Sequence, residues 1–368
     1  MKPRDVTAIR LLSQGITAPL AVDPASLVRA LGAVQAQDYL ASLWALGLRL
    51  RGATEATVES AIASRAVLRT WPMRGTIHFV AAEDARWMLA LMAPRSIEAH
   101  RKRLLRDWEL DEKTVARARK VLTRALSGAP PMPRAELYRR LDQAGIATAA
   151  QRGLHVVWRL AQEGLLCFGP RSGKQPTFVL LDDWVPGHRD LGRDEALAEL
   201  ARRYFATRGP ATLNDFSWWT GLPIAELRPG LEAIEGELER GTIGGTACWF
   251  AGDAAAAAKR RRGAAHLLPP FDEYVIAYRD RSAVLDPAHV NAARHGIFGG
   301  IVVLDGRIAG TWNRAIAKGR VTLGTRWFGK PKKTQVAAVA ATAERYGEFL
   351  GRPVLLGADA PPVPAPRR

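Results

Sequence analysis

Residues 134–181, RAELYRRLDQAGIATAAQRGLHVVWRLAQEGLLCFGPRSGKQPTFVLL, decide the predicted fold. The first ten have a helical pattern that a glycine ends, and Thr148, followed three residues later by Gln151, matches the capping box of a second helix. Apolar stretches at 165–168 and 177–181 predict two strands joined by a Gly/Pro loop. The order helix, turn, helix, hairpin predicts a winged helix, which is a helix-turn-helix unit suited to duplex DNA.

The second helix of this unit separates an apolar face from a polar face. Its apolar residues repeat with the 3.6-residue period of a helix and are Leu154, Val157, Trp158 and Ala161. The polar face carries Arg152, His155 and Arg159, which we expect to face the major groove of DNA. The hairpin loop carries Arg171 and Lys174, which we expect to contact phosphates.

A similar order of elements occurs twice more, which predicts an architectural repeat. Near the start, three helices and then two strands are expected at 4–14, 24–34, 57–64, 67–70 and 76–80. Later, three helices and then two strands are expected at 194–208, 212–220, 223–234, 237–242 and 246–250. Pro229 and Gly230 are expected to kink or end the last of these helices. The expected fold class is therefore α+β, with three tandem winged-helix units over 1–108, 109–190 and 191–252.

The rest of the chain has a different composition. A basic linker is expected over 253–266, a β-rich domain over 267–356 and a disordered tail over 357–368. Strands are expected at 274–278, 300–304, 308–317 and 320–328, and a closing helix at 332–350. Asp305 and Gly306 predict a hairpin between two of these strands.

Length and charge indicate a large protein with a polyanionic partner. With 368 residues, 48% of them apolar, the chain is long enough for several hydrophobic cores. Its 53 Lys and Arg residues exceed its 36 Asp and Glu residues, which gives a formal net charge of +17. Such an excess favours nucleic acid through counterion release, although genome composition alone also produces arginine-rich chains. We expect double-stranded DNA as the partner.

Several kinds of site lack support in the sequence. Cys167 and Cys248 are the only cysteines, so the chain has no multi-cysteine metal cluster and fits a reducing compartment. No phosphate-binding loop, GxSxG elbow or HExxH motif occurs. No apolar stretch has the length of a signal peptide or a membrane span, so we expect a cytoplasmic protein without a metal site.

Asp272 and Glu273 are adjacent carboxylates within LPPFDEY, residues 268–274. On a strand, adjacent side chains point to opposite faces, so these two are poorly placed to share acid/base chemistry. We therefore expect a structural role, in a hydrogen-bonded turn or in a salt bridge to Arg279 or Arg281.

The segment LGAVQAQDY, residues 31–39, places polar side chains where an apolar helix ends. If the chain becomes extended there, Gln35 and Gln37 share a face and Asp38 turns away, because strand side chains repeat every two residues. If the helix continues, Gln35 and Asp38 pair instead. The spacing by itself favours the ordinary polarity of a helix end over a functional role.

Four phrases, spread in order over most of the chain, resemble the AlkZ and YcaQ family of helix-turn-helix DNA glycosylases. They are LGAVQAQD at 31–38, RTWPMRGTIHFV at 69–80, LPPFDEYVIAYRDR at 268–281 and VLDGRIAGTWNR at 303–314. The resemblance implies three tandem winged helices and a β-rich, barrel-like C-terminal domain, wrapped into a C-shape with a basic concave face. It also implies excision of alkylated purines, chiefly N7-alkylguanine, and in some members the unhooking of interstrand crosslinks.

The resemblance also assigns an active motif. In this family the motif is Gln, an apolar residue, then Gln or Asp, and it falls here on Gln35, Ala36 and Gln37. A glutamine in the last position is similar to the AlkZ-like branch, whose members are linked to resistance against natural-product alkylators. The resemblance implies neither a metal nor a cofactor.

Two amides suit a substrate whose leaving group needs no proton. A carboxamide does not accept a proton near neutral pH, so neither glutamine is a general base. An N7-alkylguanine is already cationic and leaves as a neutral base, so the developing oxocarbenium ion needs electrostatic stabilisation and a placed water. Our hypothesis is that Gln37 holds this water, while Gln35 orients Gln37 and the deoxyribose. The motif offers no lysine for a Schiff base, so hydrolysis without strand nicking is expected.

Other residues and other functions stay open at this point. Arg69, Arg74 and His78 lie in or beside the first expected hairpin, where they either touch DNA or simply face solvent. A winged-helix transcription regulator and a damage binder without catalysis are the alternative functions. Regulators usually act as symmetric dimers, whereas three units in one chain favour a monomer that embraces duplex DNA.

Overall fold

The computed structural model describes residues 1–257, 263–290, 299–317 and 319–357. Its N-terminal helices are α1 (Pro3–Ser13), α2 (Pro24–Leu31), α3 (Tyr39–Gly47) and α4 (Glu55–Ala63), with the short strand β1 (Ala33–Gln35) between α2 and α3. Asp23 caps α2 by accepting a hydrogen bond of 3.0 Å from the Ser26 amide. The helix expected over 24–34 ends early, because Gly32 adopts a φ of 74° and the chain then becomes extended. Helix α3 was not expected from the sequence.

The first two hairpins form one six-stranded sheet. Its strands are β1, β2 (Val67–Met73), β3 (Thr76–Ala81), β4 (Met132–Pro133), β5 (Leu166–Ser172) and β6 (Gln175–Leu180). Their order is β1-β3-β2-β5-β6-β4, and the pairing of Arg69 with Phe168 joins β2 to β5. The turn expected over 71–75 is shortened to Arg74 and Gly75, because β2 continues to Met73. The first hairpin is therefore embedded in a sheet on both sides.

In the second group the helices occur where the sequence predicts them, but the predicted cap is absent. It comprises η1 (Ala82–Asp84), α5 (Ala85–Trp108), α6 (Glu112–Leu126), α7 (Arg134–Gln143), α8 (Arg152–Gln162) and α9 (Leu181–Trp184). The capping box expected at Thr148 and Gln151 is wrong. The Thr148 amide and hydroxyl both donate to the Asp142 carboxylate, at 2.8 and 2.9 Å. Gln151 itself precedes α8 with a φ of 69° and makes no side-chain cap.

The third group contains the expected order of helices and strands. It comprises α10 (Arg193–Arg208), α11 (Leu213–Thr220), α12 (Ile224–Glu232), η2 (Glu235–Glu237) and the hairpin β7 (Glu239–Ile243) and β8 (Thr246–Phe250). Helix α12 passes through Pro229 and Gly230 and ends only at Glu232, so this pair does not end the helix. Gly230 allows α12 to approach α10 closely, since a Cβ there would lie 2.7 Å from the backbone of Leu197.

The C-terminal part contains an open sheet. After α13 (Gly252–Ala257) come β9 (Ala265–Leu268), α14 (Glu273–Ile276), η3 (Pro287–His289), β10 (Gly300–Leu304), β11 (Arg307–Ala317), β12 (Arg320–Trp327), α16 (Lys333–Leu350) and β13 (Val354–Gly357). The strand order is β13-β12-β11-β10-β9, with β12 and β13 parallel and the other pairs antiparallel. Among the described residues this sheet has two edges, at β13 and β9, so the expected barrel-like closure is not found.

Two further expectations for this part change. The strand expected over 274–278 is wrong, because Asp272 accepts the Tyr274 amide at 2.9 Å and starts α14 instead. The expected linker begins as α13, and its residues 258–262 lie outside the described residues, as do 358–368 of the expected tail.

The cores cross the expected unit boundaries. One cluster joins α2 and α3 to β9–β12 and α16. Within it, the Trp44 indole donates to the Leu267 carbonyl at 2.8 Å, and its ring lies 5.0 Å from that of Tyr346. A second cluster joins β3 and α5 to α10–α12, and a third fills the group of α6, α7, α8, β5 and β6. The C-terminal part therefore packs directly against the segment that carries the glutamine motif.

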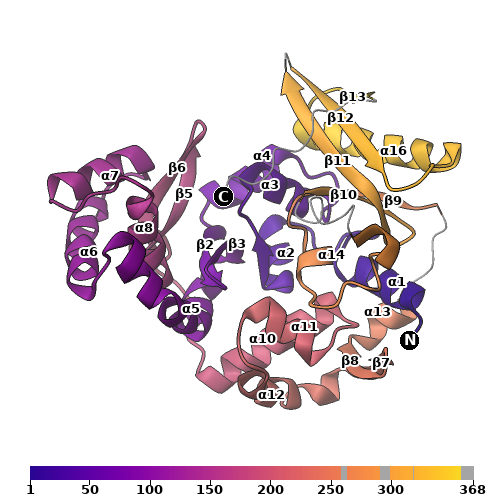
Figure 1. The fold of residues 1–368 in the computed structure, drawn as a ribbon, viewed down its shortest axis with the longest axis horizontal. Coiled ribbons are helices and arrows are strands. Elements are labelled where there is room, and N and C mark those ends of the chain that lie inside the picture. The colour runs from indigo at the N-terminus through magenta and orange to yellow at the C-terminus, as the bar shows by residue number, and fades with distance from the viewer. Residues whose placement is uncertain (258–262, 291–298, 318, 358–368) are drawn as a thin grey trace.

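Figure 1 shows how these groups are arranged around the N-terminal elements. The group of α6, α7 and α8 lies on one side, the sheet of β9–β13 with α16 on the other, and α10–α12 below, while α2–α4 occupy the middle. None of the described helices combines the length and the apolar character needed to cross a membrane.

Candidate active site

The glutamine motif lies at the end of β1 in an extended conformation. Strand β1 pairs with β3 so that Gln35 faces His78, and the Ala36 amide continues the ladder by donating to Ile77 at 2.8 Å. The side-chain amide nitrogen of Gln35, Nε2, donates to the side-chain oxygen of Gln37, Oε1, at 3.3 Å. Of the two conformations considered from the sequence, the extended one is therefore present. Asp38 turns away to cap α3 by accepting the Ala41 amide at 3.1 Å.

The two glutamines differ in exposure. Gln35 is only 9% exposed, whereas Gln37 is an exposed residue. The Gln37 oxygen has two lone pairs, of which Gln35 uses one.

Arg69 fixes the backbone of the motif. Its guanidinium donates two hydrogen bonds to the Ala36 carbonyl, at 2.7 and 2.9 Å. The same group lies over the ring of Phe168 at 4.4 Å and over that of Tyr39 at 5.2 Å. Burial lowers the pKa of Arg69 to about 10, which leaves it cationic at neutral pH. Arg69 therefore holds the motif, whereas its position in the expected hairpin suggested contact with DNA or with solvent.

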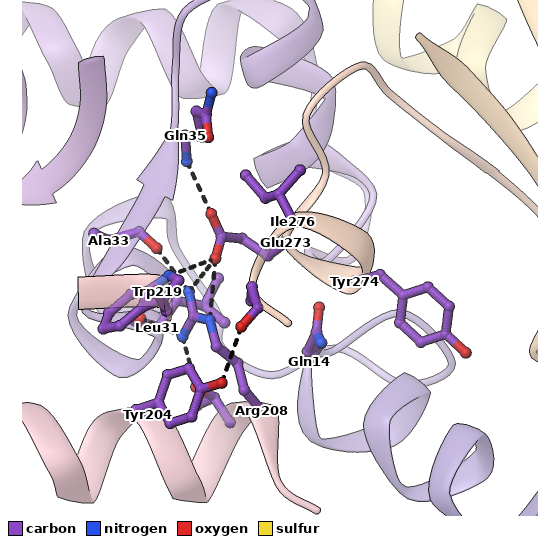
Figure 2. Close-up of polar contacts among 12 residues, drawn as sticks. Gln14, Leu31, Ala33, Gln35, Tyr204, Arg208, Trp219, Glu273, Tyr274 and Ile276 are labelled. Atoms are coloured by element: carbon purple, nitrogen blue, oxygen red, sulfur yellow. Dashed lines mark hydrogen bonds and ion pairs between the residues drawn. The ribbon is translucent and has the colours of Figure 1, made fainter. Parts of the chain in front are cut away.

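A buried ion pair lies behind Gln35 (Figure 2). Glu273 accepts the Gln35 backbone amide at 3.1 Å with one oxygen. Its other oxygen accepts from Arg208 at 2.8 and 3.0 Å and from the Trp219 indole at 2.9 Å. Arg208 also donates to the carbonyls of Leu31 and Ala33, at 2.7 Å each. In Figure 2 the Gln35 side chain points away from Glu273, so this network holds the backbone and leaves the amide free to reach Gln37.

The network keeps Glu273 ionised. Glu273 and Arg208 are both completely buried. Burial favours the neutral acid, but Arg208 and the hydrogen bonds from Arg208 and Gln35 hold the pKa of Glu273 below its ordinary value. The buried carboxylate of Glu273 is thus neutralised by Arg208 and accepts hydrogen bonds from a guanidinium, an indole and a backbone amide.

The adjacent carboxylate forms a separate buried pair. Asp272 binds both terminal nitrogens of Arg49, at 2.8 and 2.9 Å, and both side chains are buried. Asp272 and Glu273 therefore form salt bridges with arginines, as expected. The expected partners, Arg279 and Arg281, are wrong. The actual partners come from distant parts of the chain, so local spacing could not identify them.

His78 lies opposite Gln35 on β3, and Arg74 lies in the turn between β2 and β3. His78 is completely buried, and its Nδ1 lies 2.9 Å from the Thr76 carbonyl. Burial, and secondarily the nearby Arg74, lowers the pKa of His78 to about 4, so the ring is neutral at pH 7. The His78 side chain therefore reaches neither solvent nor a surface accessible to DNA, the two placements considered from the sequence.

Arg74 faces a cationic cavity. It occupies the β2–β3 turn with a φ of 52°, and its Nε and Nη2 have no hydrogen-bond partner in the part of the chain that the structure describes. The cavity has a volume of about 490 Å³, and its lining includes Arg95, Arg279 and the half-exposed Trp218. Three guanidinium groups around one cavity suit an anion such as a DNA phosphate.

The expected basic face of α8 is largely occupied by internal contacts. Arg152 donates to the carbonyls of Trp108 and Ala147 at 2.6 and 2.8 Å. Arg159 is 8% exposed and binds Glu112 and Glu163, because α8 turns this side chain toward α6. Arg159 therefore does not face outward as expected, whereas the half-buried Arg152 reaches the surface with its guanidinium bound to backbone carbonyls.

The two cations of the second hairpin and His155 differ in accessibility. Arg171 lies over Tyr39 at 4.3 Å and binds Glu59 at 2.5 Å. Lys174 is exposed in the β5–β6 turn. His155 is half-buried and stacks on Trp108, with ring centroids 3.5 Å apart. DNA contact stays a prediction for Lys174 and His155, while Arg171 is already paired.

An aromatic cavity adjoins Gln37. It has a volume of about 270 Å³. Its lining consists of Gln37, Trp71, Gly75, Thr76, Ile77, His100, Arg103, Leu104, Trp108, Leu154, His155 and Trp158. This cavity and the pair of Arg208 and Trp219 were not predicted from the sequence, because their residues meet only in the folded chain. No group of side chains suited to a metal ion occurs in the described ranges.

The chain is similar to known DNA glycosylases over most of its length. The model of the AlkZ-like DNA glycosylase family matches residues 28–349. The chain is 27% identical over 329 residues to an interstrand DNA cross-link repair glycosylase of Streptomyces sahachiroi. The aligned region covers 84% of this chain and 87% of that protein. The solved structure of the Streptomyces sahachiroi DNA glycosylase AlkZ superimposes with a TM-score of 0.76 and 25% identity, over 96% of this chain and 99% of that one. The resemblance noted from the four phrases is confirmed, and the chain belongs to the AlkZ-like DNA glycosylase family.

Proposed function

We propose that this DNA glycosylase hydrolyses the N-glycosidic bond of N7-alkylguanine in double-stranded DNA and acts as a monofunctional enzyme. The observation that carries the proposal is the pair of amides at the end of β1. Gln35 donates to Gln37 at 3.3 Å, and Gln37 remains exposed. Glu273 and Arg69 support the backbone of the pair from two sides.

The chemistry follows from the free lone pair on Gln37. The bond between C1′ and N9 breaks, and its electrons neutralise the cationic purine, which leaves as free N7-alkylguanine. The Gln37 oxygen holds a water whose own oxygen attacks C1′ of the oxocarbenium ion. The proton that this water loses passes to solvent, since a carboxamide does not accept it. The products are the free base and an abasic deoxyribose in an unbroken strand.

Release of one end of a crosslink is the same reaction. An interstrand crosslink through N7 leaves the purine cationic at each attached guanine, so hydrolysis at one end unhooks the two strands. The relative from Streptomyces sahachiroi is described as a cross-link repair glycosylase. Arg74 and its cationic cavity are suited to a phosphate of the bound duplex, and we propose that the protein binds DNA as a monomer.

The test is release of base from a duplex oligonucleotide that carries one N7-methylguanine, with alkali added to reveal abasic sites. Gln37→Ala and Gln35→Ala are expected to lose excision by about 100-fold or more, with little change in affinity for undamaged duplex. Gln143→Ala, at an exposed position on α7, is the matched control. Full activity in both motif variants contradicts the assignment. Binding of lesions without base release indicates a damage binder, and strong preference for one palindrome indicates a regulator.

A further inference from the structure

The cationic cavity at Arg74 is separate from the cavity that contains Gln37. Arg74 lines the cationic cavity, whereas the next residue of the β2–β3 turn, Gly75, lines the other one. Neither Gln35 nor Gln37 belongs to the lining of the cationic cavity. A group bound there is therefore not the guanine that we assign to the glutamine pair, although one turn of the chain borders both cavities.

The lining of this cavity has an excess of positive charge. Arg74 comes from the β2–β3 turn, Arg95 from α5 and Arg279 from the chain that follows α14. The remaining wall comes from α11 and its turn to α12 and includes Trp218 and Gly221. Among the described residues, the lining contains no carboxylate, and Arg95 and Arg279 form no salt bridge. The positive charge is thus available to an anionic ligand.

The Arg74 side chain is fixed in the wall of the cavity. Gly221 follows α11 with a φ of 77°, and a Cβ there would lie 2.9 Å from Cγ of Arg74, so glycine permits this close approach. The Nε and Nη2 atoms of Arg74 are buried and have no hydrogen-bond partner within the described ranges. Buried donors without an acceptor are costly, and a phosphate oxygen satisfies them with a charge-assisted hydrogen bond.

Trp218 supplies a flat apolar wall in the same cavity. Its indole Nε1 donates to the Ile276 carbonyl at 3.0 Å, and the Arg281 guanidinium lies 5.6 Å from the centre of the ring. These contacts hold the ring, and the residue is still 44% exposed. An aromatic ring beside a cationic groove is the arrangement by which proteins bind the bases and phosphates of unpaired nucleic acid. The cavity thus combines a phosphate site with a stacking surface.

We propose that this cavity binds one DNA nucleotide, other than the lesion, whose base has left the stack. Its phosphate lies at the three arginines, and its base lies on Trp218. The volume of about 490 Å³ is within the range of about 300–1,000 Å³ typical of small-molecule sites, which is large enough for a whole nucleotide. A phosphate of fully paired DNA would use the arginines and leave the Trp218 ring without a partner. The inference extends the phosphate contact of the proposed function and rests on the proposed binding of duplex DNA.

The experiment compares the affinities for two undamaged duplexes, one fully paired and one with a single unpaired nucleotide. Because neither duplex contains a lesion, the comparison does not depend on base release. Fluorescence anisotropy of a labelled strand gives each Kd. The unaltered protein is expected to bind the duplex with the unpaired nucleotide about tenfold more tightly, which corresponds to one base stacked on an aromatic ring.

Variants of Trp218 test the stacking surface. Trp218→Ala is expected to remove the preference for the unpaired nucleotide and to change the affinity for paired duplex by less than about twofold. Trp218→Phe also loses the hydrogen bond to Ile276 but keeps a flat ring, so it is expected to retain most of the preference. The comparison of the two variants separates the loss of stacking from a local disturbance of α11.

Arg95→Ala tests the phosphate side of the cavity. Arg95 is exposed on α5, so the variant is expected to fold normally. It is expected to weaken binding of the duplex with the unpaired nucleotide by about fivefold, roughly the worth of one hydrogen bond, and binding of paired duplex by less than about twofold. Arg124→Ala is the matched control, because Arg124 is exposed on α6 and absent from the lining, so any change is expected to be equal for the two duplexes.

The inference is overturned if the unaltered protein binds the two duplexes equally, or if Trp218→Ala leaves the preference intact. Equal losses for both duplexes in Arg95→Ala also overturn it, because they indicate a phosphate of paired DNA. Release of N7-methylguanine by a protein without the preference means that the proposed function stands and only this inference fails. Failure to release N7-methylguanine overturns the proposed function, whatever the two affinities are.

Discussion

Asp272 and Glu273 are neighbours that each form a completely buried ion pair with an arginine, but the two pairs reach different parts of the chain. Asp272 binds Arg49, which also donates to the backbone carbonyls of Gln14 and Ala45. Glu273 binds Arg208 and in addition accepts the Gln35 amide. The pairs are alike in burial and charge, and only the second contacts the glutamine motif. The contrast teaches that a buried charge identifies a site residue through its further partners.

Loss of either pair is expected to have the largest effect on stability. Asp272→Asn and Glu273→Gln each leave a buried guanidinium without its counter-charge, which costs about 3–5 kcal/mol. Urea unfolding followed by circular dichroism measures this cost. Similar losses for the two variants are expected, because both arginines are fully buried. A loss below about 1 kcal/mol in either variant contradicts this, since it is typical of an exposed pair.

Acid is expected to destabilise the fold through His78, which lies opposite Gln35 on β3. The folded protein lowers the pKa of the buried His78 to about 4, while an unfolded histidine takes a proton near 6.5. Between these values the unfolded chain binds more protons, so the stability from neutral His78 falls as the pH falls through this window, by about 3 kcal/mol in all. The pKa of Glu273 is also depressed, so its ion pair stabilises the fold at neutral pH, and this stability is lost as the pH falls through the pKa of Glu273 in the folded protein.

The free energy of unfolding, measured at several values from pH 7 to pH 4, gives the slope of stability against pH. His78→Asn keeps a donor toward the Thr76 carbonyl but removes the titrating ring, so the slope in this window is expected to flatten. His188→Gln, at an exposed position, is expected to keep it. An unchanged slope in His78→Asn excludes His78 as its source.

Much of the fold follows from local chemistry that the sequence displays. Asp23 and Pro24 begin α2, and Asp305 and Gly306, with φ values of 50° and 82°, form the expected turn between β10 and β11. The third group of helices agrees with its periodicity almost throughout. Errors occurred where a distant residue or an unexpected cap decided the outcome. Tyr274 begins a helix because Asp272 caps it, although its apolar neighbours suggested a strand.

The shared face of Gln35 and Gln37 was predictable from the sequence, whereas the residues that surround them were not. The period-two spacing of Gln35 and Gln37 was sufficient to foresee a shared face once the chain became extended. Sequence shows that an arginine is charged but not which way it points, so Arg159 was expected to face DNA, and Arg69 was expected to touch DNA or to face solvent. The same limit applies to the cavity at Gln37, because its walls come from elements that only the sheet and core bring together.

The smallest expected effect separates the two buried pairs by function. Glu273→Gln removes the charge that orients Arg208 and weakens the support under the Gln35 backbone, so the amide pair is held less accurately. A misplacement of this kind is expected to lower the single-turnover excision rate by about tenfold at a temperature where the variant is folded, with DNA affinity unchanged. Asp272→Asn, with the same loss of charge and a comparable loss of stability, is expected to keep its excision rate, because Arg49 does not contact the motif. A split between rate and affinity in Glu273→Gln alone identifies Glu273 as a positioning residue for the glutamine pair, whereas equal rates in the two variants reduce both pairs to structural supports.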